Sequence, residues 1–236
     1  MEGGLRDDCV MDSNSDRLRC LHKPKNLLDQ TERSVYYALM IQHAHHSSPR
    51  DRILDTVAML FYAQGIRAVG VDLIVAEAEV AKASFYKHFP TKDDLVVAYL
   101  LRRDEMWRAW LRDAVVRLSP DPAGQPLAIF DALSERFSSG DFRGCAFINS
   151  IVELANRDHA AHKAADAHKR AVAAQVGQIL ADAGNPDTDL AASFVMLMDG
   201  AIVTALREGK TDAARRAKMI ASTLLAANLL AGNNTP

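Results

Sequence analysis

Apolar residues recur along this chain at helical spacing, and short stretches with Gly or Pro separate the periodic segments. For example, Ile53, Val57 and Phe61 are spaced i, i+4 and i+8, which places them on one face of a helix. No alternating run of β-branched residues is long enough to indicate a strand. The pattern therefore predicts an all-α fold of about nine helices.

Two segments have the sequence of a helix start. Ser48 and Asp51, with Pro49 between them, form a capping pattern, and Thr91 with Asp94 repeats it. We expect three short helices over 48–64, 71–78 and 82–88, a linking helix over 91–117, and five further helices that begin near residues 126, 144, 158, 187 and 211.

The composition is that of an ordinary globular protein. The 236 residues include 49% hydrophobic residues, 28 Lys and Arg, and 30 Asp and Glu, so DNA binding needs a local basic patch. The longest nearly apolar run, 221–232, is too short to span a bilayer, and the N-terminus has no apolar signal region. Cys9, Cys20 and Cys145 form no CxxC pair, so neither a disulfide framework nor a structural zinc site is expected. We therefore expect a cytoplasmic protein with no membrane partner, and a flexible extension over residues 1–47.

Residues 71–89 have the layout of a helix-turn-helix, in which the second helix enters the major groove of DNA. Residues 80–92 hold three lysines and one histidine but no acidic residue, which concentrates positive charge where phosphate would lie. Val80, Phe85 and Phe89 are spaced to anchor the second helix. The side chains left to face solvent or DNA are Lys82, Ala83, Ser84, Tyr86, Lys87 and His88.

The segment 53–95 resembles the DNA-binding domain of TetR/AcrR-type transcriptional regulators. The residues that match the family pattern are Val80, Lys82, Ser84, Phe85, Tyr86, His88, Phe89, Thr91, Lys92 and Leu95. The resemblance implies a helix-turn-helix DNA-binding domain over 48–107 and a helical effector-binding and dimerisation domain over 108–236. It also implies a ligand-responsive regulator, more often a repressor than an activator. Such a regulator binds a palindromic double-stranded operator as a homodimer and is released by a small molecule.

The resemblance further implies roles for individual residues. Those that would contact base edges or sugar-phosphate are Lys82, Ala83, Ser84, Tyr86 and Lys87. Tyr86, His88 and Lys92 would mainly hold the phosphate backbone, with Lys92 at a helix N-terminus, where the helix dipole favours an anion.

Two residues depart from the family pattern. Glu79 stands in the turn where the family usually has Gly, and a left-handed conformation there costs roughly 1–2 kcal/mol. Ala81 replaces a capping Ser or Thr worth about 1 kcal/mol. The alternative function is therefore a helical ligand-binding or protein-interaction module whose DNA reading has decayed.

Aromatic residues and methionines on the later helices are candidates for a small-molecule effector pocket, although any one of them is more often part of the core. The candidates are Trp107, Trp110, Phe130, Phe147, His168, Phe194 and Met198. His168 lies on an apolar stripe, which fits a hydrogen-bonded core histidine better than a ligand contact. Asn149 and Glu153 are weaker candidates of the same kind.

The last two helices, 187–208 and 211–230, have apolar stripes that suit a four-helix bundle between two subunits. The candidate interface residues are Leu197, Ala201, Ile220, Leu224 and Ala227.

Other constellations favour ordinary structure over chemistry. His159, His162 and Asp166 share one helical face and are potential metal ligands, but a solvated polar face is the better interpretation, so no metal site is predicted. Cys145 fits a buried thiol better than a reactive one. The sequence has no nucleophile, zinc-protease, P-loop or dinucleotide motif, so we expect neither an enzyme nor a cofactor.

Overall fold

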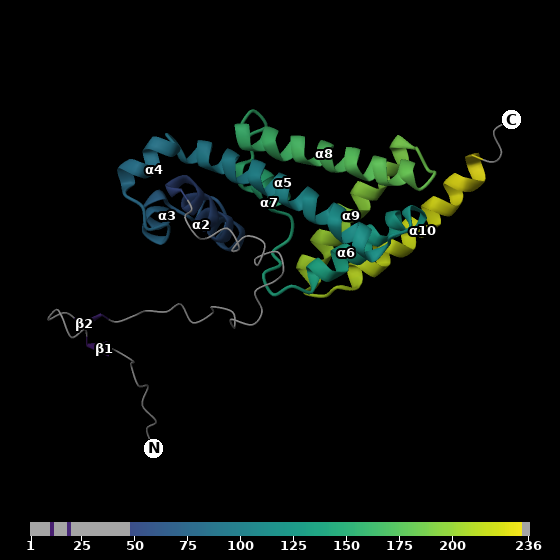
Figure 1. Cartoon of the computed structure of the whole chain (residues 1–236), viewed down its shortest axis with the longest axis horizontal. Coiled ribbons are helices and arrows are strands. Elements are labelled where there is room, and N and C mark those ends of the chain that lie inside the picture. The colour runs from purple at the N-terminus through teal and green to yellow at the C-terminus, as the bar shows by residue number, and fades with distance from the viewer. Residues whose placement is uncertain (1–9, 12–17, 20–47, 233–236) are drawn as a thin grey trace, which may run out of the picture. The chain divides into compact units, whose positions relative to one another are not determined.

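The computed structural model describes residues 10–11, 18–19 and 48–232 (Figure 1). Residues 1–33 form one compact unit and residues 34–236 another. In the first unit, β1 (Val10–Met11) and β2 (Leu18–Arg19) pair antiparallel, a short strand pair that the sequence pattern did not predict. The rest of the predicted flexible extension lies outside the described residues.

The described part of the second unit is helical and contains nine α-helices, which confirms the predicted fold class (Figure 1). They are α2 (Pro49–Gln64), α3 (Val71–Glu77), α4 (Lys82–His88), α5 (Lys92–Leu118), α6 (Gln125–Phe137), α7 (Ala146–Leu154), α8 (Ala160–Asp182), α9 (Thr188–Glu208) and α10 (Asp212–Gly232). A 3₁₀ turn, η1 (Pro122–Gly124), precedes α6.

Local hydrogen bonds explain where these helices begin. Ser48 Oγ accepts from the Asp51 backbone N–H at 3.2 Å at the start of α2. At the start of α5, Thr91 Oγ1 accepts from the Asp94 N–H at 3.1 Å, and the Asp94 carboxylate accepts from the Thr91 N–H at 3.0 Å. The capping box at Thr91 is thus complete, whereas Ser48 caps α2 through its side chain alone, and each cap contributes about 1 kcal/mol to helix stability.

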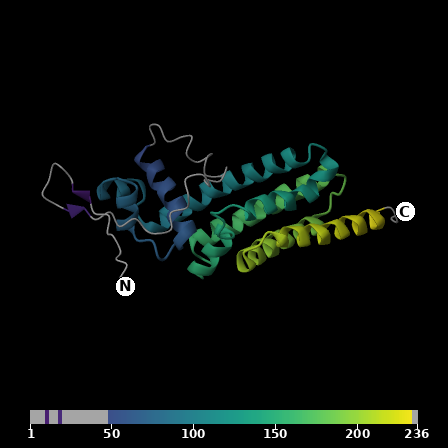
Figure 2. The same ribbon diagram turned by 90° about the horizontal axis from the view of Figure 1, so that it is seen from below.

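Two apolar cores hold the second unit together. The first core surrounds Phe85 and joins α2, α3, α4 and the start of α5 with Phe147 of α7 and Ala165 of α8. The second core joins the later part of α5 with α6, α8, α9 and α10, and α10 packs along α9 and α6 (Figure 2). Since α7 and α8 supply residues to the first core, this core continues from the helix-turn-helix into the helices that follow it.

Helix α9 is, by length and composition, apolar enough to cross a membrane, which differs from the prediction that no segment is long enough to span a bilayer. Seven of its residues, Phe194 and Met198 among them, are buried against the neighbouring helices. A core helix of a globular protein can have the same composition, and this packing accounts for part of the hydropathy of α9.

Candidate functional site

The turn between α3 and α4 adopts the conformation expected of it. Glu79 has φ +51°, in the left-handed region. The Val80 N–H donates to the Val75 carbonyl at 3.2 Å, and the Glu79 N–H donates to the Ala76 carbonyl at 3.3 Å. This pair of bonds is the Schellman arrangement, which normally has glycine at the left-handed position. The turn geometry is therefore formed despite the side chain of Glu79.

Arg52 of α2 supports this turn from outside the helix-turn-helix. Its Nε donates to the Ala78 carbonyl and its Nη2 to the Glu79 carbonyl, each at 3.3 Å. These carbonyls end α3 and have no partner within the helix, so the guanidinium acts as a side-chain cap. The role of Arg52 could not be predicted from the sequence, because Arg52 lies 26 residues before Ala78 and no local pattern connects the two.

Helix α4 has one buried face and one exposed face, as predicted. Phe85 and Phe89 are 0% and 3% exposed and anchor the helix on the first core. Lys82, Ala83, Tyr86 and Lys87 are exposed, and Ser84 and His88 are half-buried. Ala81 is the N-cap of α4 and gives it no side-chain cap, as its residue type requires.

Lys82 already has an acidic partner on α3. Its Nζ lies 2.7 Å from the Asp72 carboxylate, and this hydrogen bond raises the pKa of Lys82 above its ordinary value. Both side chains are exposed, so the pair is worth little to stability. For Lys82 to contact DNA, it must exchange Asp72 for a phosphate or base.

Lys92 also has a partner that its position in the pattern did not indicate. Its Nζ donates to the Ile66 carbonyl at 2.6 Å, in the loop between α2 and α3, and lies 5.9 Å from the centre of the Phe61 ring. Burial lowers the pKa of Lys92. This lysine thus ties the start of α5 to the end of α2, and its phosphate contact remains a prediction.

A cavity of about 30 Å³, room for about one water molecule, lies between the first core and the second. Its aromatic, aliphatic and sulfur-bearing lining consists of Trp107, Leu133, Phe137, Phe142, Cys145, Phe147, Val172, Val195, Met198 and Ile202. Tyr62, Arg103, Arg136, His168, Lys169 and Asp199 form its polar lining, and Gly144 and Ala146 complete it. Four of the predicted pocket residues, Trp107, Phe147, His168 and Met198, therefore line one cavity.

The other three predicted pocket residues do not line this cavity. Phe130 and Phe194 are fully buried in the second core with ring centres 5.6 Å apart, and Trp110 packs against the same core. Helical spacing places these residues on inward faces, but it does not distinguish close packing from the wall of a cavity.

His168 is both a core histidine and part of the cavity wall. It is 3% exposed, its Nδ1 lies 2.7 Å from the Asp104 carboxylate, and its ring stacks on Phe147. Burial lowers the pKa of His168 to about 4, so the imidazole is neutral at pH 7. Burial alone would raise the pKa of Asp104, but hydrogen bonds from Arg108 and His168 bring it below its ordinary value.

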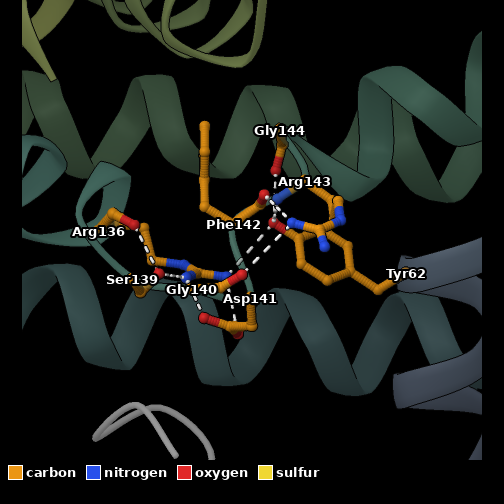
Figure 3. Close-up of polar contacts among 8 residues, drawn as sticks. All are labelled: Tyr62, Arg136, Ser139, Gly140, Asp141, Phe142, Arg143 and Gly144. Carbon is orange, nitrogen blue, oxygen red and sulfur yellow. Dashed lines mark hydrogen bonds and ion pairs between the residues drawn. The ribbon is translucent and has the colours of Figure 1, made fainter. Parts of the chain in front are cut away.

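Tyr62, near the end of α2, reaches the loop 138–145 between α6 and α7 (Figure 3). Its hydroxyl donates to the Gly144 carbonyl at 2.9 Å and accepts from the Arg143 N–H at 2.9 Å. Arg136 Nη2 donates to the same hydroxyl at 3.3 Å, and the Arg136 and Tyr62 side chains point toward each other. Arg136 also pairs with Asp141 at 2.8 Å.

Helix α7 holds the same end of α2 at a second point. The Glu153 carboxylate accepts from the Arg67 N–H at 3.0 Å, in the loop that leads to α3. Glu153 was a weak pocket candidate; it does not line the cavity described above, and a ligand contact there stays a prediction. Asn149, the other weak candidate, donates to the Arg143 carbonyl at 3.0 Å.

Two of the three candidate metal ligands have partners of other kinds. His159 lies 3.1 Å from Asp93, and Asp166 pairs with Arg170 on the same helix. In the described part of the chain, no group of three or more His, Cys, Asp or Glu side chains is placed to hold a metal ion. Cys145 is a half-buried free thiol.

The predicted dimerisation helices present an apolar surface. Exposed apolar side chains on α9 and α10 include Met196, Val203, Leu206, Met219 and Ile220. Ile220 and Ala227 are exposed, whereas Leu197 and Leu224 are half-buried against the second core. Ala201 is 4% exposed, so it contributes mainly to the core of its own chain and little to an interface.

Comparison with known proteins places this arrangement among bacterial regulators. Residues 53–99 match the model of the family described as bacterial regulatory proteins, tetR family. A TetR-family transcriptional regulator from Streptomyces coelicolor, SCO4454, is 34% identical, covering 74% of this chain and 96% of that one, with a TM-score of 0.62. The repressor NemR of Escherichia coli K12 is 26% identical over 142 residues, 60% of this chain and 71% of NemR. The reduced form of NemR has a similar fold, with 23% identity, coverage of 74% and 95%, and a TM-score of 0.67.

Proposed function

Since the chain belongs to the TetR family and is a DNA-binding transcriptional regulator, we propose that it is a cytoplasmic repressor that binds a palindromic operator as a homodimer. The observation that carries the proposal is the exposed face of α4. This face presents Lys82, Tyr86 and Lys87 and has no acidic residue, while Phe85 fixes the helix from behind. A helix held in this way can enter the major groove, where lysines reach bases and phosphates.

The exposed apolar surface of α9 and α10 supports the dimer. A groove of about 200 Å³ between these helices includes Met196, Leu197 and Ile220 in its lining. Met196 and Ile220 are 74% and 52% exposed, and contiguous apolar surface of this kind marks protein contacts. Two helix pairs brought together by a twofold axis form a four-helix bundle, and the two α4 helices must then lie about 34–36 Å apart to read successive major grooves.

The cavity supports release by a small molecule. A ligand larger than about one water molecule must move part of the wall, because the cavity holds only about 30 Å³. Most of the wall consists of packed helices, whereas the loop 138–145 is irregular and contains Gly144 at φ +80°. This loop holds Tyr62 of α2. A ligand that displaces the loop thus favours another position of the DNA-binding helices and lowers operator affinity by its differential affinity for the two states.

The rival hypothesis of decayed DNA reading rests on Glu79 and Ala81. The Schellman bonds of the turn and the cap from Arg52 weigh against it, because the turn keeps the geometry that positions α4. The left-handed conformation of Glu79 therefore lowers stability more than it changes the position of α4.

Selection of bound sequences from random duplex DNA by the full-length protein tests this function. We expect a palindrome with half-sites one helical turn apart, and affinity that falls steeply with salt. Lys87→Ala should weaken operator binding by about 1–3 kcal/mol and relax the preference at one base pair. Lys210→Ala, an exposed lysine between α9 and α10, is the matched control and should leave binding unchanged. Recovery of no sequence above background, or equal binding by Lys87→Ala and the parent, would contradict the proposal.

A further inference from the structure

The polar lining of the cavity contains three cationic side chains, one of which, Arg136, is paired with Asp141 outside the lining. Arg103, Arg136 and Lys169 come from α5, α6 and α8, and Asp199 of α9 is the one carboxylate among the residues that line it. Lys169 forms an ion pair with Asp199. His168 adds no positive charge at neutral pH, because burial lowers its pKa to about 4.

The two arginines are buried and close to one aromatic ring. Arg103 is 6% and Arg136 is 9% exposed, and their guanidinium carbons lie 4.1 Å and 5.9 Å from the centre of the Tyr62 ring. Both guanidinium groups have partners in the folded chain, so a ligand must offer an acceptor at least as good as the one it replaces. Their planar forks match the oxygens of a carboxylate, which a neutral ligand does not offer in the same form.

The contacts of Arg136 indicate where an incoming carboxylate would bind. Its two Nη atoms donate to Asp141 at 2.8 Å and 3.2 Å, and Nη1 also donates to Ser139. Nη2 also donates to the Tyr62 hydroxyl, a neutral acceptor, at 3.3 Å. A carboxylate is the stronger acceptor, so it would replace Tyr62 at this position.

Apolar side chains form much of the cavity wall. They include Trp107, Phe147, Val172 and Met198. This combination suits a molecule with an apolar body and one charged end, the usual form of a small-ligand site.

Building on the proposed function, we infer that the effector is a small organic anion, a carboxylate with an apolar body. Its charged end binds Arg103 and Arg136 and displaces the Tyr62 hydroxyl. Its apolar body lies against Trp107 and Phe147 and moves the loop 138–145 outward. The carboxylate that the two arginines recognise is therefore also the group that releases Tyr62.

Calorimetric titration of the full-length protein with matched acids and amides tests the ligand class. The probes are butyrate with butyramide and benzoate with benzamide, and benzylamine serves as the cation of similar size. We expect each acid that binds to bind at least about tenfold more tightly than its amide, because charged hydrogen bonds exceed neutral ones by this order. If no acid binds more tightly than its amide, or if benzylamine binds most tightly, the inference is wrong.

Variants of two arginines on α5 test whether Arg103 causes the preference for acids over amides. Arg103→Met should bind each acid and its amide with similar affinity, and Arg103→Lys should restore part of the preference for the acid. Arg112→Met, an exposed arginine on the same helix, is the matched control and should keep the full ratio. The ratio compares two ligands on the same variant, so a general loss of stability does not change it. Survival of the full preference in Arg103→Met would overturn the assignment.

DNA selection without ligand separates this inference from the proposed function. A recovered palindrome together with no acid preference would refute the anion site alone. Acid preference together with no recovered DNA sequence would refute the regulator alone.

Discussion

Removal of the Tyr62 hydroxyl, by Tyr62→Phe, tests the junction between α2 and the loop 138–145. The hydroxyl makes two hydrogen bonds of 2.9 Å with Gly144 and Arg143 and a longer one with Arg136. The ring remains, so little packing is lost. The Gly144 carbonyl and Arg143 N–H lose their partner in a part-buried site, which costs about 1–3 kcal/mol. We therefore expect Tyr62→Phe to lower the free energy of unfolding by about 2 kcal/mol.

Urea denaturation followed by circular dichroism, at one protein concentration, measures this loss. In a chain of 236 residues it corresponds to a fall of about 4–8 °C in Tm, with no change in the dependence on urea. Tyr86→Phe is the control, because Tyr86 is exposed on α4 and should change stability by less than about 0.5 kcal/mol. Tyr62→Phe should also weaken the effect of the ligand on operator affinity. If Tyr62→Phe is as stable as Tyr86→Phe, the Tyr62 hydroxyl does not hold the junction.

Three further predictions concern the turn, the dimer and the buried histidine. Glu79→Gly should raise the free energy of unfolding by up to about 1 kcal/mol, because glycine adopts positive φ without strain; a drop in urea midpoint would show that Glu79 makes a stabilising contact. Ile220→Arg should give monomers by light scattering and abolish operator binding, and a persistent dimer would place the interface elsewhere. The lowered pKa of His168 means that the unfolded chain binds more protons than the folded chain between pH 6.5 and 4. Stability should therefore fall as the pH drops through this window, by at most about 3 kcal/mol, and His168→Gln should flatten that part of the profile.

The helices of this chain could be predicted because their signals are local. The starts of α2 and α5 depend on Ser48 and Thr91, whose caps bond residues three positions away. Helix α4 runs from Lys82 to His88, as predicted. The left-handed conformation at Glu79 follows from its place in the turn. A pattern that involves only neighbours in sequence can be recognised without knowing how the helices pack.

The candidate site was predicted only in part. Phe147 and Phe194 are both aromatic residues on predicted helices. Phe147 lines the cavity, whereas Phe194 lies in the second core. Helical periodicity indicates which face of a helix is buried, and it carries no information on which other helix covers that face.

The sequence by itself determined the helical order, the helix-turn-helix and the exposed basic face of α4, because spacing and capping act within a few residues. Tertiary structure alone decided the contacts of Arg52, Tyr62 and Glu153, which bond partners 26, 82 and 86 residues away. Such contacts depend on the exact approach of elements that the chain brings together only on folding. The link between cavity and DNA-binding helices consists of these distant pairs, so it can be seen only in the folded molecule.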